Sequence, residues 1–294
     1  DKHCSFAMSQ YTLVLAAPSS GKSDKVDDIC ARLNIKYGLK AAFCSKETSN
    51  VIHHNKWVRR LLGRKPTIDD FKKNDLYYVK HYINDNFFSV VDTGDLNETL
   101  NVFRNIYKRY GVKLFVIDPF NRVRHKDVNR SDINEYTEQY HHELDKFVKD
   151  TDSHLFLVLH PTKMSYKENS KTTYAMPTAY NAKGGGEHFD MSYNMLGMVR
   201  DFDRGVVTLK TLKWKFDHLG TSGVEWEEAW NINNGRYSDL AEGYIPTVGD
   251  LSVDAYWDND CWIINNEEKE SIDYIQSFEQ EKIPERVDLD KINF

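Results

Sequence analysis

The sequence lacks the features that mark membrane, secreted and zinc-binding proteins. It contains no run of about eighteen apolar residues, and residues 1–10 lack the basic and then apolar layout of a secretory signal. The cysteines are few and scattered without a CxxC pair, which indicates neither a disulfide framework nor a zinc site: they are Cys4, Cys30, Cys44 and Cys261. We therefore expect a cytoplasmic protein without a membrane partner.

Two pairs of adjacent histidines, His53 with His54 and His141 with His142, could suggest a metal site. Adjacent residues on a helix point in different directions, so they do not share one ion easily. We expect these histidines to pack or to face solvent.

The charge of the chain is unevenly distributed. The net charge is -6, but residues 240–294 carry 14 acidic and 4 basic side chains, which leaves residues 1–239 with a surplus of 4 positive charges. A weakly basic body is compatible with nucleic acid but does not require it. We expect one large domain over residues 1–239 and an acidic C-terminal extension over residues 240–294.

Apolar, β-branched runs alternate with segments of helical period, which is typical of an α/β fold with a mostly parallel sheet and crossover helices. One helical face is predicted from Ile133 to Val148, and residues 162–194 have little periodicity, which favours a long functional loop. From Gly205 onward, the pattern predicts a C-terminal antiparallel extension of the sheet. The expected parallel strands are 11–16, 40–45, 113–118 and 154–160.

The strongest motif lies between the first expected strand and the next helix. This segment ends in the GK[ST] signature of a phosphate loop; its residues are Ala16, Ala17, Pro18, Ser19, Ser20, Gly21, Lys22 and Ser23. Backbone N–H groups of such a loop cradle phosphates, Lys22 would contact the β and γ phosphates, and the Ser23 hydroxyl would hold Mg²⁺. We therefore expect ATP and Mg²⁺ as ligands. The generic pattern has glycine where this chain has Ala16.

Two acidic residues follow other expected strands. Asp118 ends an apolar strand and fits the second Mg²⁺ position, through water. Glu47 comes just after the strand 40–45, at the sheet edge where ligands of such folds bind, so it is the candidate to orient the attacking water. Taken alone, Glu47 could equally be a solvated loop carboxylate.

These residues resemble the hexameric replicative helicases of the DnaB and Twinkle type, which are RecA-like P-loop NTPases and include phage primase-helicases. In that family the phosphate loop often begins with alanine and contains Pro-Ser, as Ala16–Ser23 does. The segment Ser45–Glu47 resembles the family motif whose glutamate is the catalytic base, and 115–121 resembles its Walker B strand. His160 matches a γ-phosphate sensor of the Twinkle-like version.

The resemblance also implies DNA-binding and subunit-bridging residues. The family's flexible DNA-binding loop matches residues 182–190, and the residues it would place at the DNA are Lys183, Gly184, Gly185 and Gly186. A hinge is the alternative for this glycine run. Lys213 would match a phosphate-touching lysine and Lys215 the arginine finger, both reaching a neighbouring subunit's nucleotide. Lysine lacks the bidentate fork of arginine, and solvated lysines on an edge strand are the alternative.

The resemblance covers residues 10–238 and implies an ATP-dependent DNA helicase that translocates on single-stranded DNA. It further implies a homo-oligomer, usually a hexamer, with primase or other replication proteins as partners, in a bacterial or phage-infected host cytoplasm. Because only ten residues precede the first expected strand, ring assembly is not assumed for this chain alone. Two alternatives remain: a RecA-like ATPase acting as a loader or regulatory module without unwinding, and a small-molecule kinase. The order of the motifs argues against the kinase.

Overall fold

The computed structural model describes most of the chain up to Asp239 and three short strands beyond it. The described residues are 3–67, 75–90, 93–124, 133–162, 164–168, 170, 172–184, 186–239, 255–258, 261–264 and 267–268. None of the helices within these ranges combines the length and the apolar character that crossing a bilayer requires.

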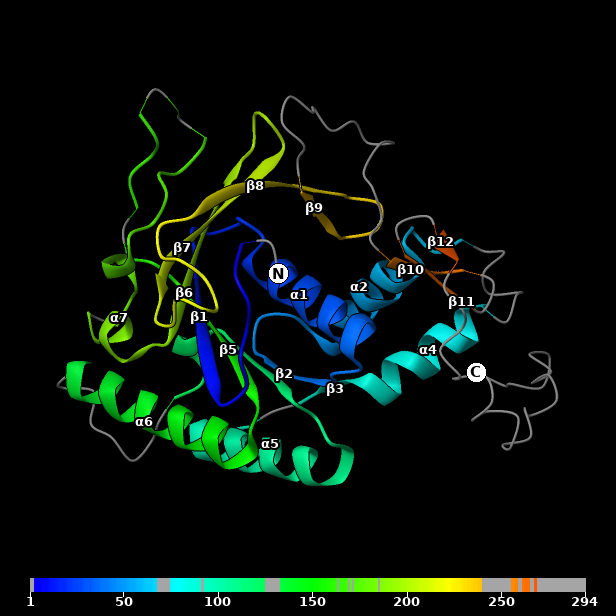
Figure 1. Cartoon of the computed structure of the whole chain (residues 1–294), viewed down its shortest axis with the longest axis horizontal. Helices are drawn as coiled ribbons and strands as arrows, with labels where there is room; N and C mark the ends of the chain where they lie inside the picture. Colours follow the sequence, from blue (N-terminus) through cyan, green and yellow to red (C-terminus); the bar gives the residue numbers. More distant parts are fainter. Residues whose placement is uncertain are drawn as a thin grey trace.

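A parallel sheet forms the centre of the fold (Figure 1). Its middle strands lie in the order β2–β4–β5–β1, and each pairs in parallel with its neighbours. Nearly all of their residues are buried, which explains why the sequence shows continuous apolar runs rather than alternation. The bounds are β1 (Gln10–Ala16), β2 (Ala41–Ser45), β4 (Leu114–Asp118) and β5 (His154–Leu159).

Helices cover both faces of this sheet, and successive strand residues point to opposite faces. Val14 packs in a cluster with residues of α1 (Lys22–Tyr37), α2 (Asn50–Leu62) and α4 (Asp75–Asn86). Leu13 and Leu15 pack on the other side, with residues of α5 (Leu96–Tyr110) and α6 (Ile133–Thr151). The layered arrangement of helices on each side of the sheet is visible in Figure 1.

The sheet continues beyond β1 and changes direction. β6 is parallel to β1, and the strands that follow it are antiparallel to one another, so the described strands of this sheet number nine, in the order β3-β2-β4-β5-β1-β6-β7-β8-β9. A separate small sheet contains β10, β11 and β12. The bounds are β3 (Phe87–Ser89), β6 (Asn194–Asp201), β7 (Val206–Trp214), β8 (Glu225–Trp230), β9 (Tyr237–Asp239), β10 (Ala255–Asp258), β11 (Cys261–Ile264) and β12 (Glu267–Glu268).

The predicted fold class is confirmed: a mostly parallel α/β sheet with crossover helices and an antiparallel extension. The four expected parallel strands and the helix from Ile133 are present. The expected loop over 162–194 also contains the short helices η2 (Ala179–Asn181) and α7 (Glu187–Met191), and η1 (Phe120–Arg122) follows β4. Most of the proposed extension 240–294 lies outside the described residues.

Candidate nucleotide-binding site

The loop after β1 is shaped to expose backbone N–H groups. It closes at Gly21, which has a φ of 86° in the left-handed region and forms the N-cap of α1. No side chain in the described part of the chain caps this helix start. The first N–H groups of a helix have no partner within the helix, and its N-terminus attracts anions. This end of α1 can therefore bind phosphate groups.

Gly21 is fitted closely to Tyr237, on β9. The Tyr237 hydroxyl donates to the Gly21 carbonyl at 3.1 Å, and a Cβ at Gly21 would lie 2.5 Å from the same hydroxyl oxygen. The Arg32 side chain of α1 donates to the Tyr237 carbonyl, so the tyrosine is attached to the same helix. The last strand of the sheet thus supports the loop from behind, and only glycine fits at its closing position.

Asp118 lies beside this loop, at the end of β4, with only 5% of its surface exposed. The Ser23 hydroxyl hydrogen-bonds to its carboxylate, whereas its Oδ1 has no hydrogen-bond partner among the described residues. Burial raises the pKa of Asp118 to about 6. A buried, unpartnered carboxylate oxygen next to a hydroxyl fits the oxygen ligands that Mg²⁺ prefers.

Glu47, His160 and Lys22 meet at the same edge of the sheet. Glu47 Oε1 lies 3.5 Å from His160 Nε2 and 3.8 Å from Arg122 Nε. Burial and the nearby Lys22 ammonium lower the pKa of His160, although Glu47 opposes this shift. Burial also lowers the pKa of Lys22, against the pull of the Asp118 and Glu47 carboxylates. The structure therefore brings together the phosphate-loop lysine, both acids and the histidine that the motifs indicated.

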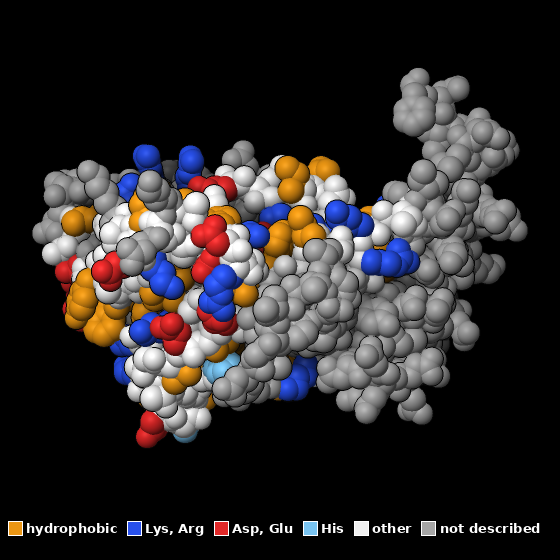
Figure 2. Space-filling model, turned by 90° about the horizontal axis from the view of Figure 1, so that it is seen from above, with side chains coloured by type: hydrophobic (Ala, Val, Ile, Leu, Met, Phe, Trp, Pro, Cys, Tyr) orange, Lys and Arg blue, Asp and Glu red, His pale blue; other side chains and the backbone are white. Residues whose placement is uncertain are grey.

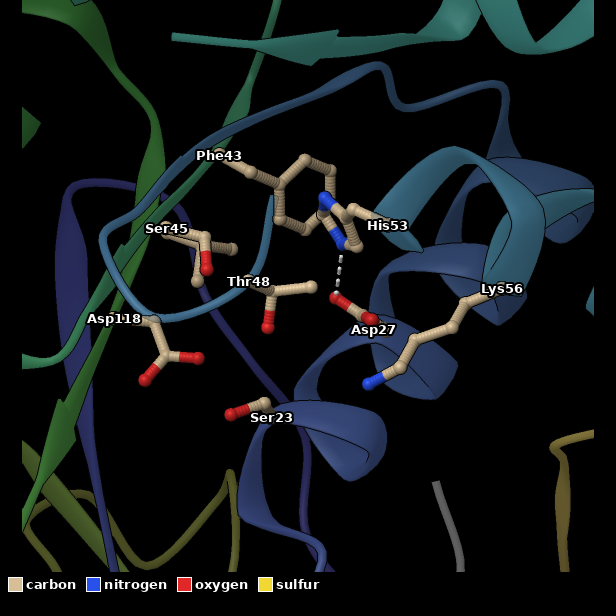
Figure 3. Close-up of a pocket in the computed structure, with 9 residues that line it drawn as sticks. Ser23, Asp27, Phe43, Ser45, Thr48, His53, Lys56 and Asp118 are labelled. Atoms are coloured by element: carbon tan, nitrogen blue, oxygen red, sulfur yellow. Dashed lines mark hydrogen bonds and ion pairs between the residues drawn. The ribbon is translucent and has the colours of Figure 1, made fainter. Parts of the chain in front are cut away.

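A pocket opens beside these residues (Figure 3). Ser23 and Asp118 border it from α1 and β4, and Thr48 borders it from the loop that carries Glu47. Among the described residues, no group of three or more His, Cys, Asp and Glu side chains is placed to hold a metal by itself. A magnesium ion here would take only a few protein ligands, with phosphate and water as the rest. The lining residues are Ser23, Asp27, Phe43, Ser45, Thr48, His53, Lys56, Val116 and Asp118.

The predicted DNA-binding segment is attached to the end of β5. Lys183 donates its backbone N–H to the His160 carbonyl at 2.9 Å, and its side chain is exposed. The Gly184 carbonyl accepts a hydrogen bond from the Thr137 hydroxyl at 2.8 Å, and Gly186 forms the N-cap of α7. Gly185 lies outside the described residues.

Lys213 and Lys215 do not line the pocket of their own chain. The Lys213 ammonium donates to the carbonyls of Phe189 and Asp190, at the end of α7. The Lys215 ammonium lies 5.0 Å from the centre of the Tyr193 ring, and the residue is exposed. Their proposed contacts with a neighbouring subunit remain predictions.

Three residues of the site were not found from the sequence. Asp27 lies four residues after Ser23, so helical spacing could have indicated a shared face. Arg122 follows the Walker B strand, but only the fold shows its contact with Glu47. Tyr237 carried no signal, because it contacts Gly21 across 216 residues of sequence.

The close contact between Gly21 and Tyr237 predicts a pair of coupled substitutions. Gly21→Ala should lower the free energy of unfolding by about 1–3 kcal/mol more than Gly38→Ala, because both glycines have positive φ but only Gly21 faces a neighbouring atom. Tyr237→Phe should recover part of this loss in the double variant, since the hydroxyl oxygen makes the clash. Urea unfolding of the four proteins measures this coupling, and strictly additive effects would contradict the contact.

The raised pKa of Asp118 predicts a pH-dependent stability difference. Its folded pKa of about 6 exceeds the ordinary value of 3.8, so the folded protein keeps the proton within this window and loses stability as pH rises through it. Without nucleotide and Mg²⁺, the stability of Asp118→Asn relative to the natural protein should therefore increase by about 3 kcal/mol between pH 4 and pH 7. Chemical unfolding across this range measures the difference, and a pH-independent difference would show that the carboxylate is well solvated.

Comparison with known proteins agrees with this architecture. No protein-family model matches the sequence. The Twinkle homolog protein, chloroplastic/mitochondrial, of Arabidopsis thaliana is 25% identical over 255 residues, which cover 83% of this chain and 34% of that protein. The chain thus spans about a third of the length of this relative.

Solved structures share the fold. An isolated ATPase domain of known structure matches with a TM-score of 0.64 and 13% identity, over 80% of this chain and 86% of that one. A DnaB-like replicative helicase, solved in a study of its interactions with primase, matches with a TM-score of 0.66 and 14% identity, over 80% and 60% of the two chains. The resemblance predicted from the motifs is confirmed: in sequence the chain is related to Twinkle, and in fold it matches the RecA-like ATPase domains of DnaB-type replicative helicases.

Proposed function

We propose that this chain is the motor of a replicative DNA helicase, which hydrolyses MgATP to translocate on single-stranded DNA. The observation that carries the proposal is the convergence of Lys22, Asp118, Glu47 and His160 at one edge of the sheet, next to the open start of α1. The relation to Twinkle and the fold shared with DnaB-like helicases support it. We assign the motor to residues 1–239 and leave 240–294 as an acidic extension.

Each residue of the site has a task in this proposal. The backbone N–H groups of residues 16–23 and the Lys22 ammonium bind the phosphates, and the Ser23 hydroxyl holds the magnesium. Asp118 accepts hydrogen bonds from water on the metal through its unpartnered Oδ1. When bound, Mg²⁺ neutralises charge on the phosphates during hydrolysis.

Glu47 is proposed as the catalytic base that orients the attacking water. It is half-exposed and directly precedes Thr48 of the pocket lining, with its carboxylate near His160 and Arg122. These two partners hold the carboxylate in position while it stays accessible to water. His160 is proposed to sense the γ-phosphate, because its ring lies close to both Glu47 and Lys22.

The proposed DNA contact is the segment Lys183, Gly184, Gly185 and Gly186. The described charges do not identify a DNA surface by themselves, because basic and acidic side chains are interspersed on the face shown in Figure 2. The support is instead the backbone hydrogen bond between Lys183 and His160, which joins this segment to the nucleotide site at 2.9 Å. A shift of His160 on hydrolysis would therefore move the backbone that binds DNA.

A ring of subunits would complete the site. We propose that Lys213 and Lys215 contact the nucleotide of a neighbouring subunit in a homo-oligomer, with six subunits as in the family that the motifs resemble. Both lysines are at the end of β7 and outside the pocket of their own chain, which fits a contact made in trans. Primase is proposed as a partner because the DnaB-like helicase of similar fold was solved in a study of that interaction.

Steady-state ATPase activity with and without single-stranded DNA tests the proposal. Glu47→Gln should lower turnover by about 10²–10⁴-fold while nucleotide affinity is kept, because the amide cannot accept a proton. Lys22→Ala should abolish nucleotide binding. Glu138→Gln, an exposed glutamate on α6, is the matched control and should be unaffected.

The outcome also separates two kinds of protein. DNA-stimulated hydrolysis together with strand displacement supports the helicase. Hydrolysis without displacement, in a protein shown to form rings, indicates a loader or regulatory ATPase instead. Normal turnover in Glu47→Gln would show that another group is the base.

A further inference from the structure

Asp27 is a second carboxylate at the pocket beside the phosphate loop. It lies one helical turn after Ser23 on α1, so both side chains are on the same face of the helix. Both line the pocket together with Asp118 and Thr48. In Figure 3 the Asp27 carboxylate points from α1 toward the space that Ser23, Thr48 and Asp118 surround. The unpartnered Asp118 Oδ1, nine-tenths buried, belongs to the same pocket.

The fold keeps Asp27 charged although it is buried. Only 4% of the residue is exposed, and burial alone would raise the pKa of its carboxyl. His53 and Arg60 outweigh this effect, and the pKa of Asp27 is lowered. His53 Nε2 lies 3.1 Å from Asp27 Oδ1, and Arg60 Nη1 lies 3.7 Å from Oδ2. A buried carboxylate that is held ionised supplies a fixed negative charge.

His53 is itself held in place by aromatic side chains of α2 and β2. Its ring packs edge-on against Phe43 at 5.0 Å, and the Trp57 indole nitrogen lies 3.2 Å from its Nε2. One ring nitrogen cannot both donate to Asp27 and accept from Trp57. A hydrogen bond to a charged carboxylate is the stronger of the two, so the Nε2 proton is directed to Asp27.

We propose that Asp27 belongs to the magnesium site as an outer carboxylate, accepting hydrogen bonds from metal-bound water opposite Asp118, and that His53 positions it. The inference rests on the proposed function, since it assumes that MgATP binds at Ser23. Magnesium usually keeps several of its waters in proteins, and these waters need acceptors. The Asp27 charge also acts on Asp118, where it contributes to the raised pKa, so both carboxylates act on one small space. A cation between them relieves this repulsion.

Binding of a fluorescent ADP analogue in Mg²⁺ and in EDTA tests the proposal without relying on turnover. The ratio of the two Kd values measures how much the metal contributes to binding. Asp27→Asn should reduce this ratio by about tenfold while the Kd in EDTA stays within about twofold, because outer-shell partners of metal ligands typically contribute 10–100-fold. Asp28→Asn is the matched control: this neighbour is equally buried and pairs with Arg32 at 2.8 Å, but does not line the pocket.

The variants separate the outcomes. An unchanged ratio in Asp27→Asn, or an equal fall in Asp28→Asn, would overturn the proposal. If Asp27→Asn fails to show a cooperative thermal transition, His53→Gln replaces it; this variant keeps the carboxylate and should lower the ratio by about threefold, and an unchanged ratio would again overturn the proposal. A natural protein that binds the analogue in neither condition, or equally in both, would instead contradict the proposed function.

Discussion

The whole site depends on the parallel pairing of β2, β4, β5 and β1. Because these strands run in one direction, their carboxyl ends meet at one edge of the sheet, and the segments that follow them lie next to each other. The phosphate loop, the Glu47 loop, Asp118 and His160 each follow one of these strands. The register is tight: Ser45 at the end of β2 is the direct partner of Asp118 at the end of β4. Residues that are distant in the sequence thereby form one small charged site.

Charge and burial at this edge are balanced against a ligand. Burial raises the pKa of Asp118 and lowers that of Lys22, so the fold places both groups where their charged forms are poorly solvated. A bound triphosphate and its metal would offset this cost, which favours binding over an empty site. Behind the loop, the nearly inaccessible Arg60 of α2 lies 3.6 to 4.0 Å from carboxylates of α1, including Asp28. This buried ion cluster joins the helix after the phosphate loop to the helix after Glu47.

The sequence predicted the parts of the molecule that depend on local patterns. Continuous apolar runs located the four central strands, and the loop ending at Ser23 located the phosphate site. Contacts between distant segments could not be predicted in this way. The support of Gly21 by Tyr237, and the attachment of Lys183 to His160, exist only because the sheet brings β9 and residues 182–186 to the strand ends. The short strand β3 was missed for a related reason, since its three residues are set by pairing with β2.

The central claim is that the start of α1 binds a triphosphate whose magnesium is shared by Ser23 and Asp118. A crystal structure of the chain with Mg²⁺ and a non-hydrolysable ATP analogue tests this most directly. The account predicts phosphates against the backbone N–H groups before Ser23, and a metal bound to its hydroxyl with water between the metal and Asp118. A nucleotide bound elsewhere on the chain, with this helix start facing only solvent, would contradict it.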